Sequence, residues 1–210
     1  MLIIGAKGFA KEVLEILHQN GETENLCFYD DENEDAPDLL FGKFPVLKSE
    51  EEAKTYFTNT DVRFTIGIGN PRLRKFLTEK FEKLAGKLCS TISKHAEIGS
   101  FNIQIEAGCN ILGGARISND VKIGKGTMVY YNSLITHDVE IGEYVEISPG
   151  ATLLGRCKIG NYCSIGAGAI IFPDVNIGSN SVVAAGSVVR NDVPQNVMVA
   201  GMPAEIKKNL

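Results

Sequence analysis

Residues 141–171 read IGEYVEISPGATLLGRCKIGNYCSIGAGAII, and an aliphatic residue occupies every sixth position of this stretch. The same spacing runs from Ile105 to Val189, where all fifteen positions are Ile, Leu or Val. Ile92 and Ile98 continue it upstream, with one extra residue before Ile105. A small residue often stands two positions before the aliphatic one, and a glycine often follows it. A period of six residues fits neither an amphipathic α-helix nor the two-residue alternation of an ordinary strand.

This repeat predicts a β-helix built from short strands and tight corners. The aliphatic side chain of each unit would point inward beside the small residue, and glycine would allow the corner conformation. Three units make a coil, and stacked coils bury a continuous apolar column. Residues 105–194 supply five coils, with about one more upstream, so at roughly 4.8 Å per coil the prism would be about 30 Å tall.

The first ninety residues have a different pattern, in which apolar runs alternate with amphipathic segments. We expect strands at residues 2–4, 26–29 and 64–69, and helices after the first glycine turn and over residues 72–84. This alternation predicts a small α/β unit with a parallel sheet. Residues 32–47, which are acidic and contain two prolines, predict a surface loop.

The composition is that of a globular protein, and the length fits one large or two small domains. Of the 210 residues, 44% are hydrophobic and 22% are charged, and the net charge of −5 argues against a nucleic-acid partner. No apolar run reaches the length of a membrane span and the N-terminus has no signal-peptide pattern, which predicts a cytoplasmic protein without membrane insertion. We expect a Rossmann-like unit over residues 1–88, and the β-helix with a C-terminal cap over residues 89–210.

Three strand ends of the α/β unit carry residues suited to a ligand. Gly5 and Gly8 open the first helix, where backbone N–H groups and the positive helix end can bind a phosphate, although both glycines also suit a packed turn. The full G-x-G-x-x-G pattern is absent, so dinucleotide binding is not expected. Asp30 ends the second strand, where a carboxylate can accept from ribose or a base edge, or can simply belong to the acidic loop. Together with residues 67–70, these positions predict a ligand crevice.

His137 is the candidate catalytic residue of the repeat. It stands two positions after Ile135, at a corner of the prism, so its side chain should reach a cleft or solvent. A catalytic base takes the proton of a nucleophile, and histidine titrates in the useful range. Asp138 follows it and is able to orient the imidazole. His18 and His95 are expected at the surface.

The cysteines predict packing rather than chemistry. Their number, five, is odd and they lack CxxC spacing, which indicates neither a disulfide framework nor a zinc cluster. Cys109, Cys157 and Cys163 occupy small-residue positions of the repeat, where a free cysteine behaves as a small apolar side chain.

The order of these motifs resembles one family. A glycine-rich first turn, Asp30-Asp31 after the second strand and Ile68-Gly69-Asn70 after the third precede the six-residue repeats. Over essentially the whole chain this arrangement resembles the hexapeptide-repeat acyltransferases that include bacterial sialic-acid O-acetyltransferases and UDP-amino-sugar N-acetyltransferases. The resemblance implies a left-handed parallel β-helix, an N-terminal unit that holds a nucleotide-sugar, and a homotrimer that holds acetyl-CoA between neighbouring subunits. It implies no metal.

The functional residues of that family map onto matching positions of this chain. The nucleotide-sugar contacts map to Lys7, Gly8, Phe9, Asp30, Asp31 and Gly69, and the acetyl-CoA contacts map to Glu146, Gly155, Ala167 and Ala185. The resemblance also implies that His137 is the general base, that Asp138 supports it, and that the backbone N–H of Gly155 is the oxyanion donor. Two positions depart from the family, because Phe9 and Glu146 stand where histidine is common.

The favoured function is acetyl-CoA-dependent acetylation of a 4-amino group on a UDP-linked sugar. A hydroxyl of sialic acid or of another sugar is the alternative acceptor. Three other classes remain open. A zinc enzyme would need three histidine ligands where the repeat region has only His95 and His137. The other two are a non-catalytic ligand-binding β-solenoid and a diaminopimelate-pathway acyltransferase, which usually has a different N-terminal unit.

Overall fold

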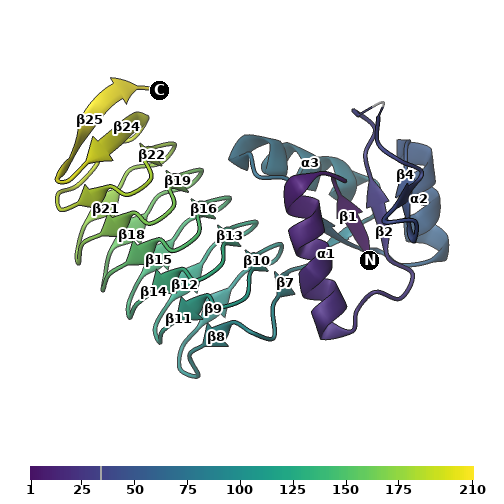
Figure 1. Cartoon of the computed structure of the whole chain (residues 1–210), viewed down its shortest axis with the longest axis horizontal. Coiled ribbons are helices and arrows are strands. Elements are labelled where there is room, and N and C mark those ends of the chain that lie inside the picture. The colour runs from purple at the N-terminus through teal and green to yellow at the C-terminus, as the bar shows by residue number, and fades with distance from the viewer. Residues whose placement is uncertain (34) are drawn as a thin grey trace. The chain divides into compact units, whose positions relative to one another are not determined.

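The computed structural model describes residues 1–33 and 35–210 and consists of two compact units, Met1–Thr91 and Ile92–Leu210 (Figure 1). The first unit contains β1 (Leu2–Ile4), α1 (Gly8–Asn20), β2 (Cys27–Tyr29), β3 (Leu39–Leu40), β4 (Phe44–Leu47), α2 (Glu50–Asn59), β5 (Arg63–Ile66), α3 (Pro71–Lys83) and β6 (Lys87–Leu88). Its sheet has the order β3-β4-β2-β1-β5-β6, in which β3 and β4 are antiparallel and the other pairs are parallel. The predicted α/β unit is therefore confirmed.

Helices cover both faces of this sheet. Leu2 and Ile4 of β1 pack with buried residues of α2 and α3. Ile3 points to the opposite face, because side chains alternate along a strand. On that face a Cβ built at Gly67 would lie 2.9 Å from Ile3 and 2.7 Å from Ala10 of α1, so glycine lets α1 pack closely. In the sheet β2 lies on one side of β1 and β5 lies on the other, so the strand order reverses at β1. The carboxyl ends of β1 and β5 therefore form a topological switch point.

The predicted surface loop at residues 32–47 is wrong in its C-terminal part, and residue 34 lies outside the described residues. β3 and β4 form a hairpin, and β4 extends the parallel sheet beside β2. Phe44 and Val46 are buried, while Pro45 between them is exposed. Burial of the alternate apolar side chains of β4 therefore outweighed the two prolines of the segment.

Helix α2 has no counterpart among the predicted elements. Ser49 caps it by accepting a hydrogen bond from the backbone N–H of Glu52 at 3.3 Å. Ala53, Tyr56 and Phe57 bury its inner face against the sheet. The Ser-x-x-Glu capping pattern before these apolar residues was the available sequence signal.

The second unit is a parallel β-helix of stacked three-sided coils. Its three sheets have the orders β25-β24-β22-β19-β16-β13-β10-β7, β23-β20-β17-β14-β11-β8 and β21-β18-β15-β12-β9. Their strands are β7 (Thr91–Ile92), β8 (Glu97–Ile98), β9 (Gln104–Ile105), β10 (Asn110–Ile111), β11 (Arg116–Ile117), β12 (Lys122–Ile123), β13 (Met128–Val129), β14 (Leu134–Ile135), β15 (Glu140–Ile141), β16 (Glu146–Ile147), β17 (Thr152–Leu153), β18 (Lys158–Ile159), β19 (Ser164–Ile165), β20 (Ile170–Ile171), β21 (Asn176–Ile177), β22 (Val182–Val183), β23 (Val188–Val189), β24 (Val197–Gly201) and β25 (Ala204–Asn209). Each coil supplies one short strand to each sheet, as the repeat predicted.

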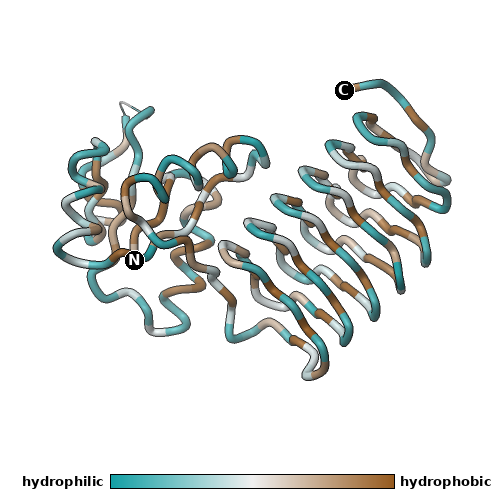
Figure 2. Tube along the Cα trace, turned by 180° about the vertical axis from the view of Figure 1, so that it is seen from behind, coloured by the Kyte–Doolittle hydropathy of each residue, from teal (hydrophilic) through white to brown (hydrophobic). Residues whose placement is uncertain are grey.

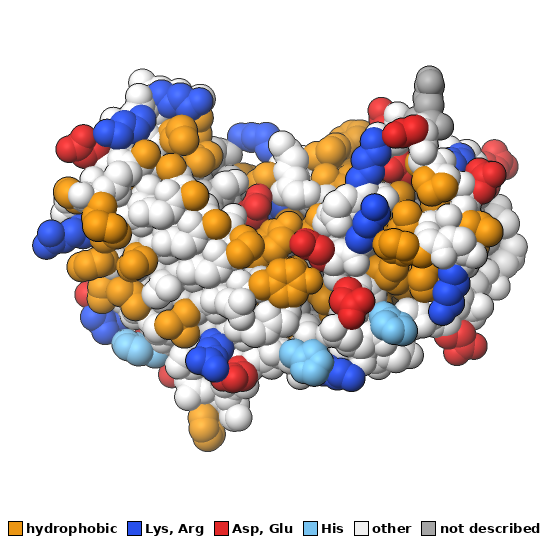
Figure 3. All heavy atoms as spheres, viewed as in Figure 1, with side chains coloured by type: hydrophobic (Ala, Val, Ile, Leu, Met, Phe, Trp, Pro, Cys, Tyr) orange, Lys and Arg blue, Asp and Glu red, His pale blue; other side chains and the backbone are white. Residues whose placement is uncertain are grey.

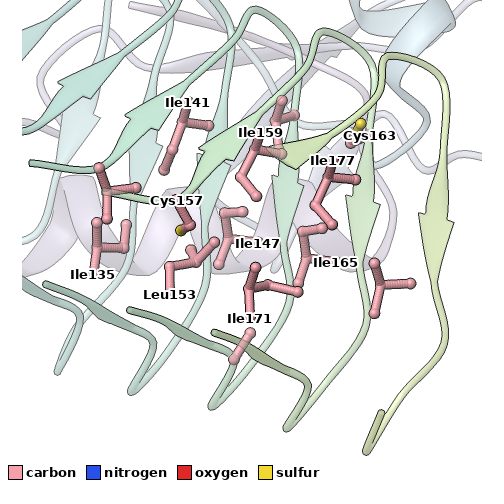
Figure 4. Packing of buried hydrophobic residues seen from close by; sticks show 14 of the residues in the cluster. Ile135, Ile141, Ile147, Leu153, Cys157, Ile159, Cys163, Ile165, Ile171 and Ile177 are labelled. Carbon is pink, nitrogen blue, oxygen red and sulfur yellow. The ribbon is translucent and has the colours of Figure 1, made fainter. Parts of the chain in front are cut away.

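The interior of the β-helix is the predicted aliphatic column. Every register position from Ile105 to Val189 is the second residue of a strand, and Figure 4 shows several of these side chains pointing inward. Figure 2 shows hydrophobic and hydrophilic residues alternating along the coils. Cys109, Cys157 and Cys163 are buried in this column, and burial raises the pKa of the Cys157 thiol to about 12 and that of Cys163 to about 11. These thiols therefore stay protonated and pack as small apolar groups.

Candidate active site

A cavity of about 590 Å³ lies at the carboxyl ends of β1, β2 and β5 in the first unit. All six residues predicted to contact a nucleotide-sugar line it, namely Lys7, Gly8, Phe9, Asp30, Asp31 and Gly69. The topological switch point of an open α/β sheet is where such sheets bind their ligands. A further wall comes from α3 and was not predicted; it consists of Leu73, Phe76, Leu77 and Lys80.

Two glycines of this cavity, Gly8 and Gly69, are not required by the fold. A Cβ built at either would meet no described atom within 4 Å, and neither has a positive φ. Gly5 differs, because its φ is 103° and a Cβ there would lie 3.1 Å from the carbonyl oxygen of Gly67. The space over Gly8 and Gly69 is therefore open, and a ligand can approach the backbone closely there.

Helix α1 begins at this cavity, and Lys7 is its N-cap residue. Within the described ranges, the Lys7 side chain makes no capping hydrogen bond to the helix. The first turn contains no acidic residue, and the partial positive charge of the helix N-terminus faces the cavity. Lys7 Nζ is exposed and lies 3.5 Å from the carboxylate of Asp35. Phe9 is mostly buried, so its ring lends the site an apolar surface. This wall suits an anion such as a diphosphate.

The two carboxylates at the end of β2 have different surroundings. Asp30 is only 6% exposed and accepts from the backbone N–H of Asn33 at 3.1 Å and from its amide at 2.7 and 2.8 Å, so it orders the segment that follows β2. Asp31 accepts from the Tyr29 hydroxyl at 2.7 Å and from the Lys80 ammonium at 3.2 Å. Burial alone would raise the pKa of Asp31, but these hydrogen bonds hold it below its ordinary value. Asp31 is thus a charged acceptor in the cavity wall.

In the second unit, His137 and Asp138 form the turn that joins β14 to β15. His137 Nδ1 lies 2.6 Å from Asp138 Oδ2, and both side chains are about half exposed. Adjacent side chains diverge along an extended chain, but Asp138 has a φ of 61°, which bends the backbone and brings its carboxylate to the imidazole. With the Nδ1 proton donated to Asp138, Nε2 keeps its lone pair and can accept a proton.

Gly155 lies against this imidazole, one coil further along the prism. A Cβ built at Gly155 would lie 2.6 Å from His137 Cε1 and 2.8 Å from its Nε2. The backbone N–H of Arg156 donates to the His137 carbonyl oxygen at 3.1 Å, which aligns the two turns. Among residues 1–33 and 35–210, no group accepts from the N–H of Gly155. The structure therefore brings together an imidazole, its carboxylate partner and a backbone donor suited to an oxyanion.

The other predicted acetyl-CoA contacts lie elsewhere on the same unit. Glu146 is in β16, and Ala167 and Ala185 are exposed residues of the turns that join β19 to β20 and β22 to β23. These turns form the edge between the first and second sheets, whereas His137 and Gly155 lie on the edge between the second and third. One chain therefore does not bring the two groups together.

In the described part of the chain, no group of three or more His, Cys, Asp or Glu side chains is placed to hold a metal ion. A helix long and apolar enough to cross a bilayer is likewise missing from those residues. A larger groove of about 730 Å³ runs along the sheet from β21 to β9, and it contains none of the predicted site residues.

Models of known families match both units. Residues 1–81 match the PglD N-terminal domain. Residues 120–155, 138–173 and 156–191 each match the bacterial transferase hexapeptide model of six repeats. No curated protein gave a significant match.

Solved structures are similar over almost the entire chain. A histidine-to-asparagine variant of perosamine N-acetyltransferase from Caulobacter crescentus, in complex with CoA and GDP-perosamine, is 29% identical, with a TM-score of 0.91 and coverage of 99% of this chain and 96% of that one. The acetyltransferase domain of PglB from Neisseria gonorrhoeae, in complex with acetyl coenzyme A, is 29% identical, with a TM-score of 0.88 and 98% coverage of both. WeeI from Acinetobacter baumannii is 31% identical, with a TM-score of 0.90 and 98% coverage of both. These likenesses confirm the Rossmann-like unit and left-handed parallel β-helix that the resemblance implied.

Proposed function

The chain belongs to the hexapeptide-repeat sugar acetyltransferases that carry a PglD N-terminal domain, and we propose that it moves the acetyl group of acetyl-CoA to an amino group of a nucleotide-linked sugar. The observation that carries this proposal is the likeness, over 99% of the chain, to an N-acetyltransferase that holds CoA and GDP-perosamine. That relative acts on an amine, which favours an amine over a hydroxyl as the acceptor here.

We assign the two substrates to different domains. The nucleotide-sugar binds in the cavity of the domain at residues 1–88, with its diphosphate at Lys7 and Gly8, where α1 begins. Acetyl-CoA binds on the domain at residues 89–210, where His137 and Gly155 meet. The proposal places the enzyme in the cytoplasm.

The geometry at His137 supports direct acyl transfer. As the acceptor nitrogen forms its bond to the thioester carbonyl carbon, Nε2 of His137 takes the proton that the nitrogen loses. The carbonyl oxygen becomes an oxyanion, to which the N–H of Gly155 donates. When the carbon–sulfur bond breaks, the thiolate of CoA leaves and the imidazolium returns the proton to it. Asp138 holds Nδ1 at 2.6 Å throughout, and so fixes the tautomer and orientation of the ring.

The function is tested by measuring release of the CoA thiol with a panel of acceptors. The panel contains UDP- and GDP-linked 4-amino sugars, a CMP-linked sialic acid, and each free sugar without its nucleotide. We expect turnover with a nucleotide-linked amino sugar and much slower turnover with the free sugar. Turnover with the sialic acid alone would replace the amine with a hydroxyl acceptor, and no turnover with any member would contradict the proposal.

Gly8→Ala should weaken binding of the acceptor without destabilising the fold. A methyl group there would project into open space, so the helix keeps its packing, and alanine favours a helical position over glycine by up to about 1 kcal/mol. The same methyl group would keep a phosphate from the backbone, and losing one hydrogen bond to a charged group costs about 1.5–3 kcal/mol, or roughly 10- to 150-fold in affinity. Steady-state kinetics should show a higher KM for the acceptor and an unchanged KM for acetyl-CoA. A normal acceptor KM would place the phosphate elsewhere.

We infer that the active assembly is a homotrimer. Ala167 and Ala185 lie on a different edge of the prism from His137 and Gly155, and Glu146 lies in a strand of the first sheet. A neighbouring copy must therefore supply one of the two groups if both contact the same acetyl-CoA. A closed cyclic arrangement of identical chains provides this. Light scattering on the active protein should give three times the mass of the chain.

Mixing two inactive chains tests the shared site directly. A trimer that contains both His137→Ala and Ala185→Trp chains has one cleft in which both edges are intact, so co-expression should restore part of the activity that each variant lacks alone. A monomer that keeps full activity, or a mixture that restores none, would contradict a shared site.

A further inference from the structure

Helix α3 places an apolar surface in the wall of the 590 Å³ cavity. Leu73, Phe76, Leu77 and Lys80 recur at intervals of three and four residues, so they share one face of the helix, and all four line the cavity. Leu77 is buried in the core, whereas Leu73 is 42% and Phe76 is 60% exposed. Figure 3 shows that hydrophobic side chains reach the surface of this unit among charged ones. The core does not account for the exposed Phe76 ring, and its position in the cavity wall makes it available to a ligand.

Charged groups border the same part of the cavity. Lys80, one helical turn after Phe76, lies 3.2 Å from the carboxylate of Asp31 and 3.1 Å from that of Glu50. Its ammonium also lies 5.6 Å from the centre of the Tyr29 ring, which holds it beside the end of β2. Residues four apart on a helix have Cβ atoms about 6 Å from each other, so the Phe76 ring and the Asp31–Lys80 pair are neighbours.

We propose that Phe76 is the surface on which the base of the nucleotide-sugar stacks, with Asp31 and Lys80 at the edge of that base. This proposal rests on the proposed function, and it states where in the cavity the base binds. A nucleobase has a flat apolar face, which stacks on aromatic rings, and an edge of N–H donors and carbonyl acceptors. A carboxylate accepts from such N–H groups and an ammonium donates to such carbonyls.

The other parts of the ligand fit this wall less well. The diphosphate is anionic and suits the positive N-terminus of α1 rather than the side chains of Leu73 and Phe76. The sugar carries hydroxyl groups and must present its amine to the acetyl donor, which the other domain binds. The base is the one planar, partly apolar group, and it has no reacting atom to present.

Titration calorimetry with UDP and GDP on the full chain tests the proposal, because neither probe carries a sugar. Stacking one base on an aromatic side chain is worth about 5- to 150-fold in affinity, so Phe76→Ala should raise the Kd of at least one nucleotide by that factor. Phe76→Trp should restore binding. Phe41→Ala is the matched control, because Phe41 is an exposed phenylalanine, at 67%, outside this cavity. Its Kd values should equal those of the wild type.

The outcomes of this experiment distinguish failure of the stacking proposal from failure of the proposed function. Equal Kd values for Phe76→Ala and Phe41→Ala with both nucleotides would overturn the stacking surface and leave acetyl transfer standing. A loss that extends to inorganic pyrophosphate, which has no base, would also overturn it, since the substitution would then have distorted the whole cavity. Wild-type protein that binds neither nucleotide would overturn both the stacking surface and the nucleotide-linked acceptor.

Discussion

Replacing His137 with alanine should lower kcat by about 10²–10⁴-fold, the usual loss when a positioned base is removed. The imidazole is the one group in the described structure that combines a fixed tautomer with contact to the proposed oxyanion donor at Gly155. Because the side chain is 56% exposed and stands in a turn outside the aliphatic column, its removal should leave the melting temperature nearly unchanged. The KM for acetyl-CoA should also change little. Stopped-flow or steady-state release of the CoA thiol measures kcat under conditions where chemistry limits the rate.

His95→Ala is the matched control for this variant. His95 is also an exposed histidine of a prism turn, the one that joins β7 to β8, and it should retain wild-type kcat. Asp138→Asn should lower kcat by a smaller factor than His137→Ala does. The amide oxygen still reaches Nδ1, but without its negative charge it no longer favours a proton on that nitrogen. If His137→Ala keeps more than a tenth of the wild-type kcat, the assignment of the base fails.

The β-helix was predictable because its rule is local. Each six-residue unit forms one strand and one corner. The spacing from Ile105 to Val189 therefore predicted the core residues, the coils and the corner position of His137 together. The clustering of strand ends in the α/β unit was equally predictable, since parallel strands bring their carboxyl ends to one edge of the sheet. That reasoning placed Gly8, Asp30 and Gly69 correctly in one cavity.

What the sequence left open depends on contacts between distant segments. Lys80 and Asp31 are 49 positions apart, and no spacing rule connects the end of β2 with the middle of α3. The wall with Phe76 was missed for that reason, although its helical periodicity was visible. The sequence analysis expected Asp138 to orient the imidazole of His137, but the geometry that allows it was not predicted, because it depends on the left-handed φ of Asp138. Aspartate adopts that conformation more readily than most residues other than glycine, and the corner of the prism places it there.

Gly155→Ala should lower kcat by about 10²-fold, although the substitution adds only one methyl group. Its Cβ would lie 2.6 Å from His137 Cε1, closer than carbon atoms approach without bonding, so the imidazole must move. A shift of about 1 Å in a reacting group costs roughly that factor in rate. The φ of Gly155 is not positive and the obstructing atoms belong to a half-exposed side chain, so the fold should accept alanine. Circular dichroism and kcat measure the two effects separately.

A glycine at an equivalent turn position serves as the control. A Cβ at Gly113 would meet its nearest neighbour, Ser93 Oγ, at 3.5 Å, so Gly113→Ala should keep both stability and kcat. The double variant His137→Ala/Gly155→Ala then isolates the cause. Once the imidazole is gone, alanine at 155 has nothing to displace, so the double variant should be about as active as His137→Ala alone, and the two losses should not add. Losses that multiply would mean that alanine at position 155 harms the reaction independently of His137, and would overturn displacement of the ring as the cause.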